Sequence, residues 1–302
     1  MLHVIDRFRP MFEKRGVELT AAKVVQTLTV PELLELVPKH DGWIIGDDPA
    51  TREVFVQGKS GKLKAAVKWG IGVDNVDIQA CEDLDIPITN TPNMFGAEVA
   101  DLALGYVIAL ARQTFDIDRG IRAGHWPKPQ GISLQGRKVA ILGCGDIGLH
   151  LAQRLQVIGM QIIAYDPFID PGRLPDGVTL AVWPERLAEI DFIVVTCALT
   201  PSSKHMISVE ALSAVKPGVR IVNVSRGSII DEPALIDALL ASHVYSAALD
   251  VFELEPLPSD SPLRKHPRCV LGSHNASNTS DAVTRTSKIA IEKLFELIET
   301  VI

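Results

Sequence analysis

The sequence predicts an α/β protein of two domains, each built on a parallel β-sheet that helices cover. Three observations favour this fold class. Short apolar runs alternate with helical patterns along all 302 residues, an order typical of parallel sheets. One of these runs ends at Leu142 and leads directly into a glycine-rich turn and a helix. A chain of this length with 47% hydrophobic residues is also too long for one ordinary core, which favours two domains.

The predicted strands are short apolar runs, rich in β-branched residues and bounded by turn residues. They cover residues 43–46, 63–69, 87–90, 139–142, 161–165, 192–196, 219–224, 246–252 and 269–272. The crossover helices between them have apolar residues at three- and four-residue steps. They cover residues 30–37, 149–158, 209–215 and 233–240.

Two turn-rich stretches mark the domain boundaries. Residues 90–96 separate a short strand from a long helix that begins near Ala97, and residues 275–281 precede a final amphipathic helix over 282–297. We expect that last helix to return to the first domain. The first domain opens with a helix over 7–14 and no preceding strand. Either the natural chain begins earlier or this domain is an incomplete variant, and the sequence leaves both possibilities open.

Composition argues against several classes of partner. The formal net charge is −7 and the basic residues are scattered, so no continuous basic face predicts nucleic-acid binding. The longest apolar stretch, 99–111, contains Asp101 and is shorter than the roughly 20 residues of a membrane span. Residues 1–10 resemble neither a signal peptide nor a transit peptide, which favours a cytoplasmic protein. The four cysteines lack metal-binding spacing, so we expect reduced thiols and no metal site.

The glycine-rich turn has the form of a dinucleotide-binding motif. Residues 143–148 read Gly-Cys-Gly-Asp-Ile-Gly between a strand and a helix. Gly143 permits a tight turn, Gly145 lets the backbone approach a pyrophosphate, and Gly148 lets the helix pack closely on the strand. The helix N-terminus would attract the anion. A Gly-x-Gly-x-x-Gly pattern alone is weak, because methyltransferases also have such turns.

An acidic residue after the next strand strengthens this interpretation. The strand 161–165 ends at Asp166, which lies about 20 residues beyond Gly143, where a carboxylate hydrogen-bonds the ribose diol of a dinucleotide. A carboxylate there repels the additional phosphate of NADP, and Pro167 and Phe168 follow it rather than Arg or Lys. The predicted cofactor is therefore NAD, and we predict an NAD-binding domain over residues 93–277 and a substrate-binding domain formed by residues 1–92 and 278–302.

Three polar residues follow the last strands of the predicted NAD-binding domain. Arg226 follows the strand 219–224, Glu255 follows 246–252, and His274 follows 269–272. The carboxyl ends of parallel strands meet at one edge, where ligands bind. An arginine can bind a carboxylate and a keto oxygen, an imidazole can exchange the proton, and a carboxylate can hold the imidazole. A lone arginine or histidine is more often a surface residue, so we assign the other histidines surface or incidental roles.

A second glycine turn lies in the first domain. It spans residues 70–73 and follows the strand 63–69. The backbone N–H groups of Gly70, Ile71 and Gly72 are candidates to bind the carboxylate of a substrate. The alternative interpretation is a plain turn between a strand and a helix.

Together these residues resemble the D-isomer-specific 2-hydroxyacid dehydrogenases, and most closely the D-3-phosphoglycerate dehydrogenase branch. The resemblance extends over nearly the whole chain. The matching motifs are Trp-Gly-Ile-Gly-Val-Asp-Asn-Val-Asp at 69–77, Asn-Thr-Pro at 90–92, the glycine turn at 143–148, Tyr-Asp-Pro at 165–167, Val-Asn-Val-Ser-Arg-Gly at 222–227 with Asp-Glu at 231–232, Leu-Asp-Val-Phe at 249–252 with Glu-Pro at 255–256, and Ser-His at 273–274.

The resemblance implies a Rossmann NAD-binding domain inserted into a smaller, flavodoxin-like substrate domain, both with doubly wound parallel sheets. It also implies that Arg226, Glu255 and His274 are the catalytic trio and that Asp250 contacts the nicotinamide amide. The further residues that it implies line the cofactor are Asp146, Ile147, Cys197, Val224 and Ser225. The family is typically dimeric through its cofactor domain, and the apolar helix 99–111 fits that role. We therefore expect a homodimer.

By this resemblance, Lys68 occupies the position at which phosphoglycerate-type members have an arginine that helps to bind the substrate phosphate. A lysine offers a point charge there without the bidentate fork of arginine. Other departures from the family pattern are Ser273 in place of proline, Asn275 in place of an apolar residue, and Cys197-Ala198 in place of Thr-Pro. The chain ends just after its last helix, so we expect no regulatory domain of the kind that some phosphoglycerate dehydrogenases have.

The leading hypothesis is an enzyme that transfers a hydride between NAD(H) and C2 of a small D-2-hydroxy acid. Two alternatives remain open. One is an NAD(H)-sensing binding protein, similar to corepressors with this fold, some of which keep the catalytic trio. The other is a dehydrogenase of formate or phosphite.

Overall fold

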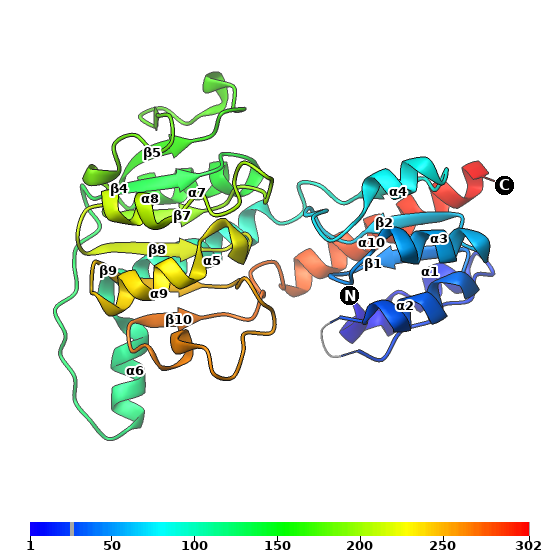
Figure 1. The fold of residues 1–302 in the computed structure, drawn as a ribbon, viewed down its shortest axis with the longest axis horizontal. Helices are drawn as coiled ribbons and strands as arrows, with labels where there is room; N and C mark the ends of the chain where they lie inside the picture. The colour runs from blue at the N-terminus through cyan, green and yellow to red at the C-terminus, as the bar shows by residue number, and fades with distance from the viewer. Residues whose placement is uncertain (25–26, 302) are drawn as a thin grey trace. The chain divides into compact units, whose positions relative to one another are not determined.

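The computed structural model describes residues 1–24 and 27–301, which form two compact units (Figure 1). Unit 1 comprises Met1–Met94 and Thr279–Ile302, and unit 2 comprises Phe95–Asn278. Each unit has its own sheet, and every strand pair described in either sheet is parallel. The predicted fold class, α/β with parallel sheets, is confirmed.

Unit 2 has a seven-stranded sheet in the order β10-β9-β8-β7-β4-β5-β6. Its strands are β4 (Lys138–Leu142), β5 (Gln161–Tyr165), β6 (Thr179–Leu180), β7 (Phe192–Val195), β8 (Val219–Asn223), β9 (Val244–Leu249) and β10 (Cys269–Leu271). The first strand of unit 2 in the sequence, β4, pairs with β5 on one side and β7 on the other. The direction of winding therefore reverses between β4 and β7, and this reversal is where open parallel sheets bind ligands.

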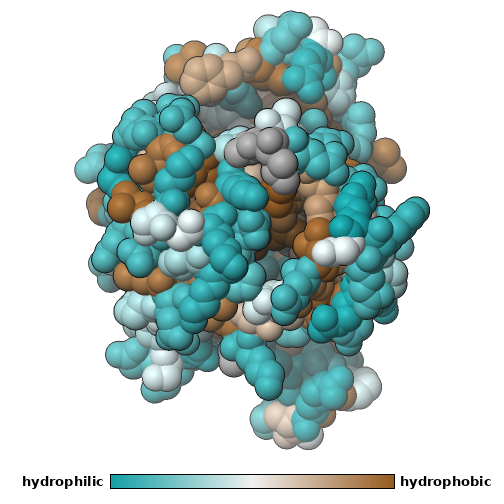
Figure 2. Space-filling view, turned by 90° about the vertical axis from the view of Figure 1, so that its right-hand side faces the viewer, coloured by the Kyte–Doolittle hydropathy of each residue, from teal (hydrophilic) through white to brown (hydrophobic). Residues whose placement is uncertain are grey.

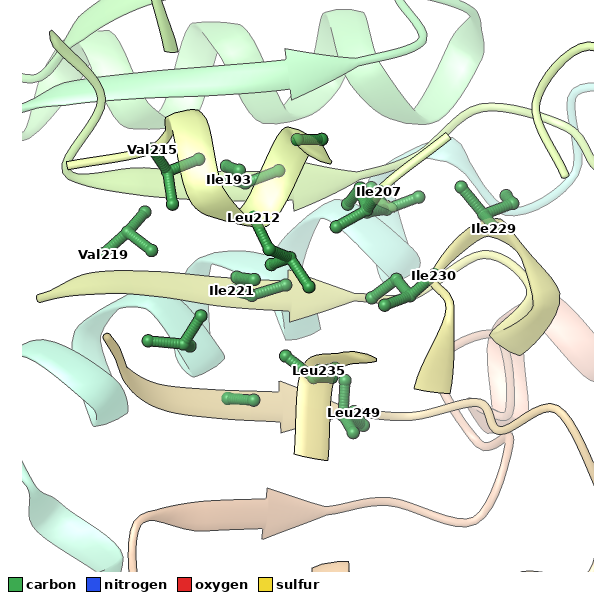
Figure 3. Packing of buried hydrophobic residues seen from close by; sticks show 14 of the residues in the cluster. Ile193, Ile207, Leu212, Val215, Val219, Ile221, Ile229, Ile230, Leu235 and Leu249 are labelled. Carbon is green, nitrogen blue, oxygen red and sulfur yellow. The ribbon is translucent and has the colours of Figure 1, made fainter. Parts of the chain in front are cut away.

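Helices cover both faces of the unit 2 sheet. Two of them, α5 (Gly96–Arg112) and α7 (Asp146–Val157), contact each other and the sheet on one face. On the other face α8 (Val209–Ala214) and α9 (Glu232–Leu240) pack on the strands through an aliphatic cluster (Figure 3). The remaining helical segments are α6 (Thr114–Arg122), η3 (Pro171–Arg173), η4 (Leu187–Glu189), η5 (Gly227–Ile229) and η6 (Pro262–Lys265).

Unit 1 has a three-stranded sheet in the order β1-β2-β3. Its strands are β1 (Gly42–Ile45), β2 (Ala65–Lys68) and β3 (Ile88–Asn90). Its helical segments are η1 (Leu2–Arg7), α1 (Arg9–Glu13), α2 (Val30–Leu36), η2 (Val37–Lys39), α3 (Arg52–Ser60), α4 (Ile78–Asp83) and α10 (Ser280–Val301). The described strands of this sheet lie side by side in the order in which they occur in the sequence, so the direction of winding does not reverse among them. Among the described residues, such a reversal occurs only in the sheet of unit 2.

The small sheet is also covered on both faces. Apolar residues of α2, α3 and α4 form one core with β1 and β2, centred on Leu33, Phe55 and Ile45. On the opposite face, Ala65 and Val67 of β2 pack against α10. Helix α10 is thus an integral layer of unit 1, although unit 2 separates it from the rest of that unit in the sequence.

The observed strands begin and end within two residues of the predicted ones, apart from one strand that the sequence did not predict and the end of β9. The unpredicted strand, β6, has only two residues, both exposed, and pairs at the edge with β5. Strand β9 ends at Leu249 rather than at residue 252, because the chain turns there toward Glu255. Strand β2 begins at Ala65 rather than at residue 63.

The surface in Figure 2 is largely hydrophilic, with hydrophobic residues in small separate patches. Among the described residues, no helix combines the length and the apolarity needed to span a bilayer.

Candidate active site

The glycine turn follows β4, and its three glycines differ in whether neighbouring protein atoms exclude a side chain. A Cβ on Gly143, whose φ is +92°, would lie 2.4 Å from the Cα of Cys197, and one on Gly148 would lie 2.0 Å from the carbonyl oxygen of Gly143. A Cβ on Gly145 would meet no described atom within 4 Å. Packing within the protein therefore explains Gly143 and Gly148, whereas the backbone at Gly145 faces open space. A pyrophosphate at the N-terminus of α7 fits that space.

Asp166 lies directly beside this turn, where a ribose would be held. Its Oδ2 accepts a hydrogen bond of 2.7 Å from the backbone N–H of Cys144, and its Oδ1 accepts one of 2.9 Å from that of Phe168. The two bonds fix the carboxylate at the end of β5. Each oxygen retains acceptor capacity for a ribose hydroxyl. The negative charge disfavours a 2′-phosphate, so the arrangement fits NAD better than NADP.

Asp250 is a buried carboxylate with an unsatisfied oxygen, and it lies just after β9. The residue is 1% exposed, and its Oδ2 accepts a 2.8 Å hydrogen bond from the N–H of Ala276. Among the described residues, its Oδ1 has no hydrogen-bond partner. The Tyr106 hydroxyl lies beside this oxygen and interacts with the carboxylate without a well-aligned hydrogen bond, so a donor such as the nicotinamide amide would stabilise this site when bound.

The sequence did not predict a role for Tyr106, whose hydroxyl neighbours Asp250. Burial and the Asp250 carboxylate raise the pKa of Tyr106 above its usual value. Gly272 leaves room for both groups, since a Cβ there would lie 2.1 Å from Asp250 Oδ1 and 2.7 Å from the Tyr106 hydroxyl. Tyr106 is part of the apolar helix α5, so its sequence context indicated only core packing.

The remaining predicted cofactor residues lie at the N-terminus of α7 and on the turns that follow β7 and β8. Asp146 and Ile147 are the first residues of α7. The hydroxyl of Ser225 donates to the carbonyl oxygen of Cys197, which ties the turn after β8 to the turn after β7. Val224, in the turn after β8, is buried. Burial raises the pKa of the Cys197 thiol to about 11, so it stays protonated and is not a nucleophile at neutral pH.

Asn223 shapes the turn that presents Arg226. Its Oδ1 accepts from the N–H of Ser225 at 3.0 Å, and its Nδ2 donates to the carbonyl oxygen of Arg226 at 2.9 Å. The guanidinium of Arg226 donates to the carbonyl oxygen of Ser225 at 2.9 Å. Gly227 follows because a Cβ there would lie only 1.8 Å from the carbonyl carbon of Phe252. Sequence reasoning found Arg226 but missed Asn223, which looked like an interior strand residue.

His274 and Glu255 form the imidazole–carboxylate pair that the sequence predicts. Nδ1 of His274 lies 2.8 Å from Oε2 of Glu255, and each side chain is 26% exposed. The other oxygen, Glu255 Oε1, accepts from the N–H of Phe252 at 2.9 Å. The backbone of His274 has a φ of +55°, and its N–H donates to the carbonyl oxygen of Asp250 at 2.6 Å. The imidazole is therefore oriented through Nδ1.

The three predicted catalytic residues follow three adjacent strands, β8, β9 and β10, at the carboxyl edge of the sheet. The histidine and the glutamate are in contact, and Gly227 packs the Arg226 turn against Phe252 of the Glu255 turn. This edge also has the glycine turn after β4. A guanidinium, an imidazole–carboxylate pair and a dinucleotide-binding turn thus share one edge, which is an arrangement suited to hydride transfer coupled to proton transfer.

The predicted substrate-binding residues of unit 1 are partly engaged within that unit. The N–H of Gly70 donates to the hydroxyl of the buried Thr91 at 2.8 Å. Of the three backbone N–H groups predicted to bind the substrate carboxylate, those of Ile71 and Gly72 therefore remain as candidates. The carbonyl oxygen of Ile71 accepts from Asn90 at 2.9 Å, which fixes the turn.

Lys68 is also engaged within unit 1. The residue is 2% exposed, and its ammonium donates to the carbonyl oxygen of Gly46 at 2.5 Å and to Oδ1 of Asp47 at 3.2 Å. Sequence reasoning missed Asp47. The signal was available, since Asp47 follows β1 just as Lys68 ends the neighbouring strand β2.

The described residues include no group of three or more His, Cys, Asp or Glu side chains placed to bind one metal ion. The acid–base group that they do contain at this edge is the His274–Glu255 pair.

Comparison with known proteins agrees with this geometry. Residues 104–276 match the family described as D-isomer specific 2-hydroxyacid dehydrogenase, NAD binding domain. The chain is 34% identical over 292 residues to the hydroxypyruvate reductase of Thermotoga maritima, covering 95% of this chain and 92% of that protein. The crystal structure of the TT0316 protein from Thermus thermophilus superposes with a TM-score of 0.88 and 31% identity, covering 98% and 93% of the two chains.

A second relative is longer than this chain. The D-3-phosphoglycerate dehydrogenase of Mycobacterium leprae is 35% identical over 266 residues, which cover 87% of this chain and 50% of that protein. The chain therefore spans about half the length of that relative. The domain match and the two relatives agree on one assignment: the chain belongs to the D-isomer-specific 2-hydroxyacid dehydrogenase family, and unit 2 contains the NAD-binding domain of that family.

Proposed function

We propose that the chain is an NAD-dependent dehydrogenase that interconverts a small D-2-hydroxy acid and its 2-keto acid. The observation that supports this most directly is the His274–Glu255 pair, at 2.8 Å, on the same sheet edge as Arg226 and the glycine turn. Bound NAD(H) supplies or accepts the hydride at C2. The protein's own groups must then bind the acid and move one proton.

His274 is the proton donor and acceptor in this proposal. Glu255 accepts from Nδ1 of His274, so Nε2 is the nitrogen that exchanges a proton with the C2 oxygen. In the direction of reduction, C2 accepts a hydride while its oxygen takes the proton from Nε2. In the direction of oxidation, Nε2 removes the hydroxyl proton as the hydride leaves C2. Glu255 holds the ring and stabilises the imidazolium.

Arg226 binds the substrate's carboxylate and keto oxygen in this proposal. Guanidinium N–H groups match both acceptors in a planar fork. Its turn is fixed by Asn223 and by the contact of Gly227 with Phe252, so the guanidinium is attached to rigid backbone. We propose that NAD is held by the three glycines of the turn after β4 together with Asp146, Ile147, Asp166, Cys197, Val224, Ser225 and Asp250. In unit 1, we propose that the amides of Ile71 and Gly72 contact the substrate.

The test is His274→Ala, assayed with a panel of 2-keto acids and either NADH or NADPH. Removal of a general acid–base group should lower kcat by about 10²- to 10⁴-fold, while the Kd for NADH should change little because the imidazole is not proposed to bind the nucleotide. His205→Ala is the matched control. His205 belongs to a second His–Glu pair of unit 2, in which its Nε2 lies 2.7 Å from Oε1 of Glu253.

Wild-type turnover in His274→Ala would reject the assignment of the proton donor. NADH binding without turnover of any keto acid by the wild-type chain would favour the NAD(H)-sensing alternative instead. Turnover of formate or phosphite in place of hydroxy acids would favour the third interpretation.

We also propose that the protein is a cytoplasmic homodimer that pairs through unit 2. The apolar residues of α5 are largely buried within unit 2, so they leave little surface for a second chain. Helix α6 has no buried residue, and large hydrophobic side chains are exposed there and just after it, at Phe115, Ile121 and Trp126. A second copy that covers them would explain this exposure. The four cysteines are free thiols, which fits a reducing compartment. Light scattering would measure the mass of the assembly.

A further inference from the structure

Two tyrosines of unit 2 connect helix α5 with strand β9 and the turn after it. Tyr245, in β9, donates its hydroxyl to Oε1 of Gln113, the residue that follows α5, at 3.1 Å. Tyr106, in α5, has its hydroxyl beside the carboxylate of Asp250, which follows β9 directly. Since both tyrosines link the same helix with the same strand, their hydroxyl groups can be compared.

The two hydroxyl groups differ in their partners. That of Tyr245 has the neutral amide oxygen of Gln113, and the guanidinium groups of Arg220 and Arg268 lie over the same ring, at 4.6 and 4.8 Å from its centroid. These contacts are made within the protein and explain Tyr245 without a ligand. The hydroxyl of Tyr106 instead faces a carboxylate. Burial and the charge of that carboxylate raise the pKa of Tyr106, so its hydroxyl stays protonated and can donate at neutral pH.

The polar groups of Asp250 are held by the protein apart from one oxygen. Its carbonyl oxygen accepts from the N–H of His274 at 2.6 Å, and its Oδ2 accepts from the N–H of Ala276 at 2.8 Å. Among the residues that the structure describes, Oδ1 has no well-aligned hydrogen bond. A Cβ on Gly272 would lie 2.1 Å from this oxygen and 2.7 Å from the Tyr106 hydroxyl. The hydroxyl therefore lies on the side of Asp250 that has the free oxygen.

A polar side chain stands out at this place in α5. The structure describes the whole of this helix, and among its buried residues only Tyr106 has a polar side-chain atom. A phenylalanine would fill the same space without a hydroxyl, whose burial is unfavourable unless the group has a polar partner. Asp250 is 1% exposed, and a buried carboxylate is also unfavourable unless donors surround it. A hydroxyl beside Oδ1 offsets both costs.

We propose that Tyr106 positions the free oxygen of Asp250 for the carboxamide of NAD(H). This inference rests on the proposed function, in which Asp250 helps to hold NAD. The hydroxyl directs its dipole toward Oδ1 and stabilises the negative charge there, to which an amide N–H donates. A carboxylate oxygen can accept from two donors at once, so the hydroxyl and the amide N–H do not compete. Tyr106 is thus a positioning residue that acts through Asp250.

The first test compares the Kd of NADH with that of ADP-ribose, which lacks the nicotinamide ring. Tyr106→Phe removes the hydroxyl and keeps the ring, so it should weaken NADH binding by about tenfold, or about 1.4 kcal/mol, and leave the Kd of ADP-ribose within about twofold. A loss of packing alone would weaken both ligands equally. Tyr245→Phe, which removes the other hydroxyl between α5 and β9, should leave both Kd values unchanged. Calorimetric titration measures them.

The second test asks whether the effect passes through the amide N–H and Asp250. In the reduced dinucleotide that has an acetyl group in place of the carboxamide, a methyl group replaces the amide nitrogen. Tyr106→Phe should therefore leave the Kd of this analogue within about twofold of the wild-type value. In a chain that already has Asp250→Ala, adding Tyr106→Phe should not weaken NADH binding further, because the two residues act as one unit.

An unchanged or lower Kd for NADH in folded Tyr106→Phe would refute the positioning role, and so would equal weakening of NADH and ADP-ribose. A tenfold effect on the acetyl analogue would refute the route through the amide. None of these results affects the reduction of 2-keto acids, so the proposed function would stand. A wild-type chain that does not bind NADH would overturn both. If melting curves show that Tyr106→Phe is unfolded, Tyr106→Leu, which also lacks the hydroxyl, takes its place.

Discussion

At the scale of single residues, the three glycines of the nucleotide turn are constrained by different neighbours. The protein itself excludes a side chain at Gly143 and Gly148, while no described atom within 4 Å excludes one at Gly145. Gly145 also has an ordinary extended backbone, with φ −70° and ψ −157°, that alanine adopts without strain. One motif thus contains residues that matter for folding and a residue that matters for the ligand.

Substitution by alanine should separate the two roles. Gly145→Ala should leave the melting temperature nearly unchanged and weaken NADH binding by about tenfold or more, because the methyl group enters the space for the pyrophosphate. Gly148→Ala should destabilise the chain by about 1–3 kcal/mol through overpacking. Calorimetric titration and thermal melts measure the two effects. Equal loss of stability in both variants would contradict the separation.

The sequence predicted individual site residues where their strands determine their positions. Arg226, Glu255 and His274 each follow a parallel strand, so the edge they share could be inferred from the order of the strands. The engagement of Lys68 by Asp47 and of the Gly70 amide by Thr91 depends on contacts between segments far apart in the chain. Side-chain contacts of this kind have no periodic signal in the sequence, so the order of the strands could indicate that Asp47 lies near Lys68 but not that the two side chains pair.

At the scale of elements, the agreement between predicted and observed strands depends on how deeply each strand is buried. Strands β4, β7 and β8 are almost entirely buried and were evident as apolar runs. Strand β6 is a pair of exposed residues without such a pattern, and only its pairing with β5 defines it. The boundaries of α7 and α9 could be predicted to within a few residues, because a glycine turn and an aspartate cap mark their starts.

Three segments of unit 2 meet at Asp191, just before β7. Its carboxylate accepts from Lys216 Nζ at 2.6 Å, from the N–H of Lys138 at 3.0 Å and from Arg137 Nη1 at 3.1 Å. Burial acts to raise the pKa of Asp191, but these donors outweigh burial and hold the pKa below its usual value. The ionised form is therefore favoured more in the folded chain than in the unfolded chain.

Because of these contacts, the free energy of unfolding depends on pH in the acid range. The unfolded chain binds the proton more readily, so the stabilisation by Asp191 is complete well above pH 4 and is lost as pH falls through the lowered folded pKa, below about 3.8. Asp191→Asn should be less stable than wild type at pH 7, by about 1–3 kcal/mol, and the difference should shrink toward pH 3. Urea unfolding at several pH values measures it, and a constant difference would contradict the linkage.

At the scale of the whole molecule, each unit has its own sheet and core. The groups that we propose to bind NAD, from Gly143 to Asp250, all belong to unit 2. NADH at about 100 times its Kd should stabilise the folded state that binds it by about 2.7 kcal/mol. Hydrogen exchange should show protection in the turns after β4, β5, β7 and β9. Protection confined to unit 1 would contradict the assignment of the nucleotide to unit 2.

Unit 1 is discontinuous in the sequence, and this has a consequence for synthesis. Its last layer, α10, buries Ala65 and Val67 of β2 and packs with Phe8 and Phe12, yet it follows all of unit 2 in the chain. On the ribosome, unit 2 can complete its fold while the small sheet still has a bare apolar face. During synthesis of unit 2, this apolar surface is therefore exposed and available to chaperones or to aggregation with other nascent chains. The exposure ends when α10 emerges from the ribosome and packs on the sheet.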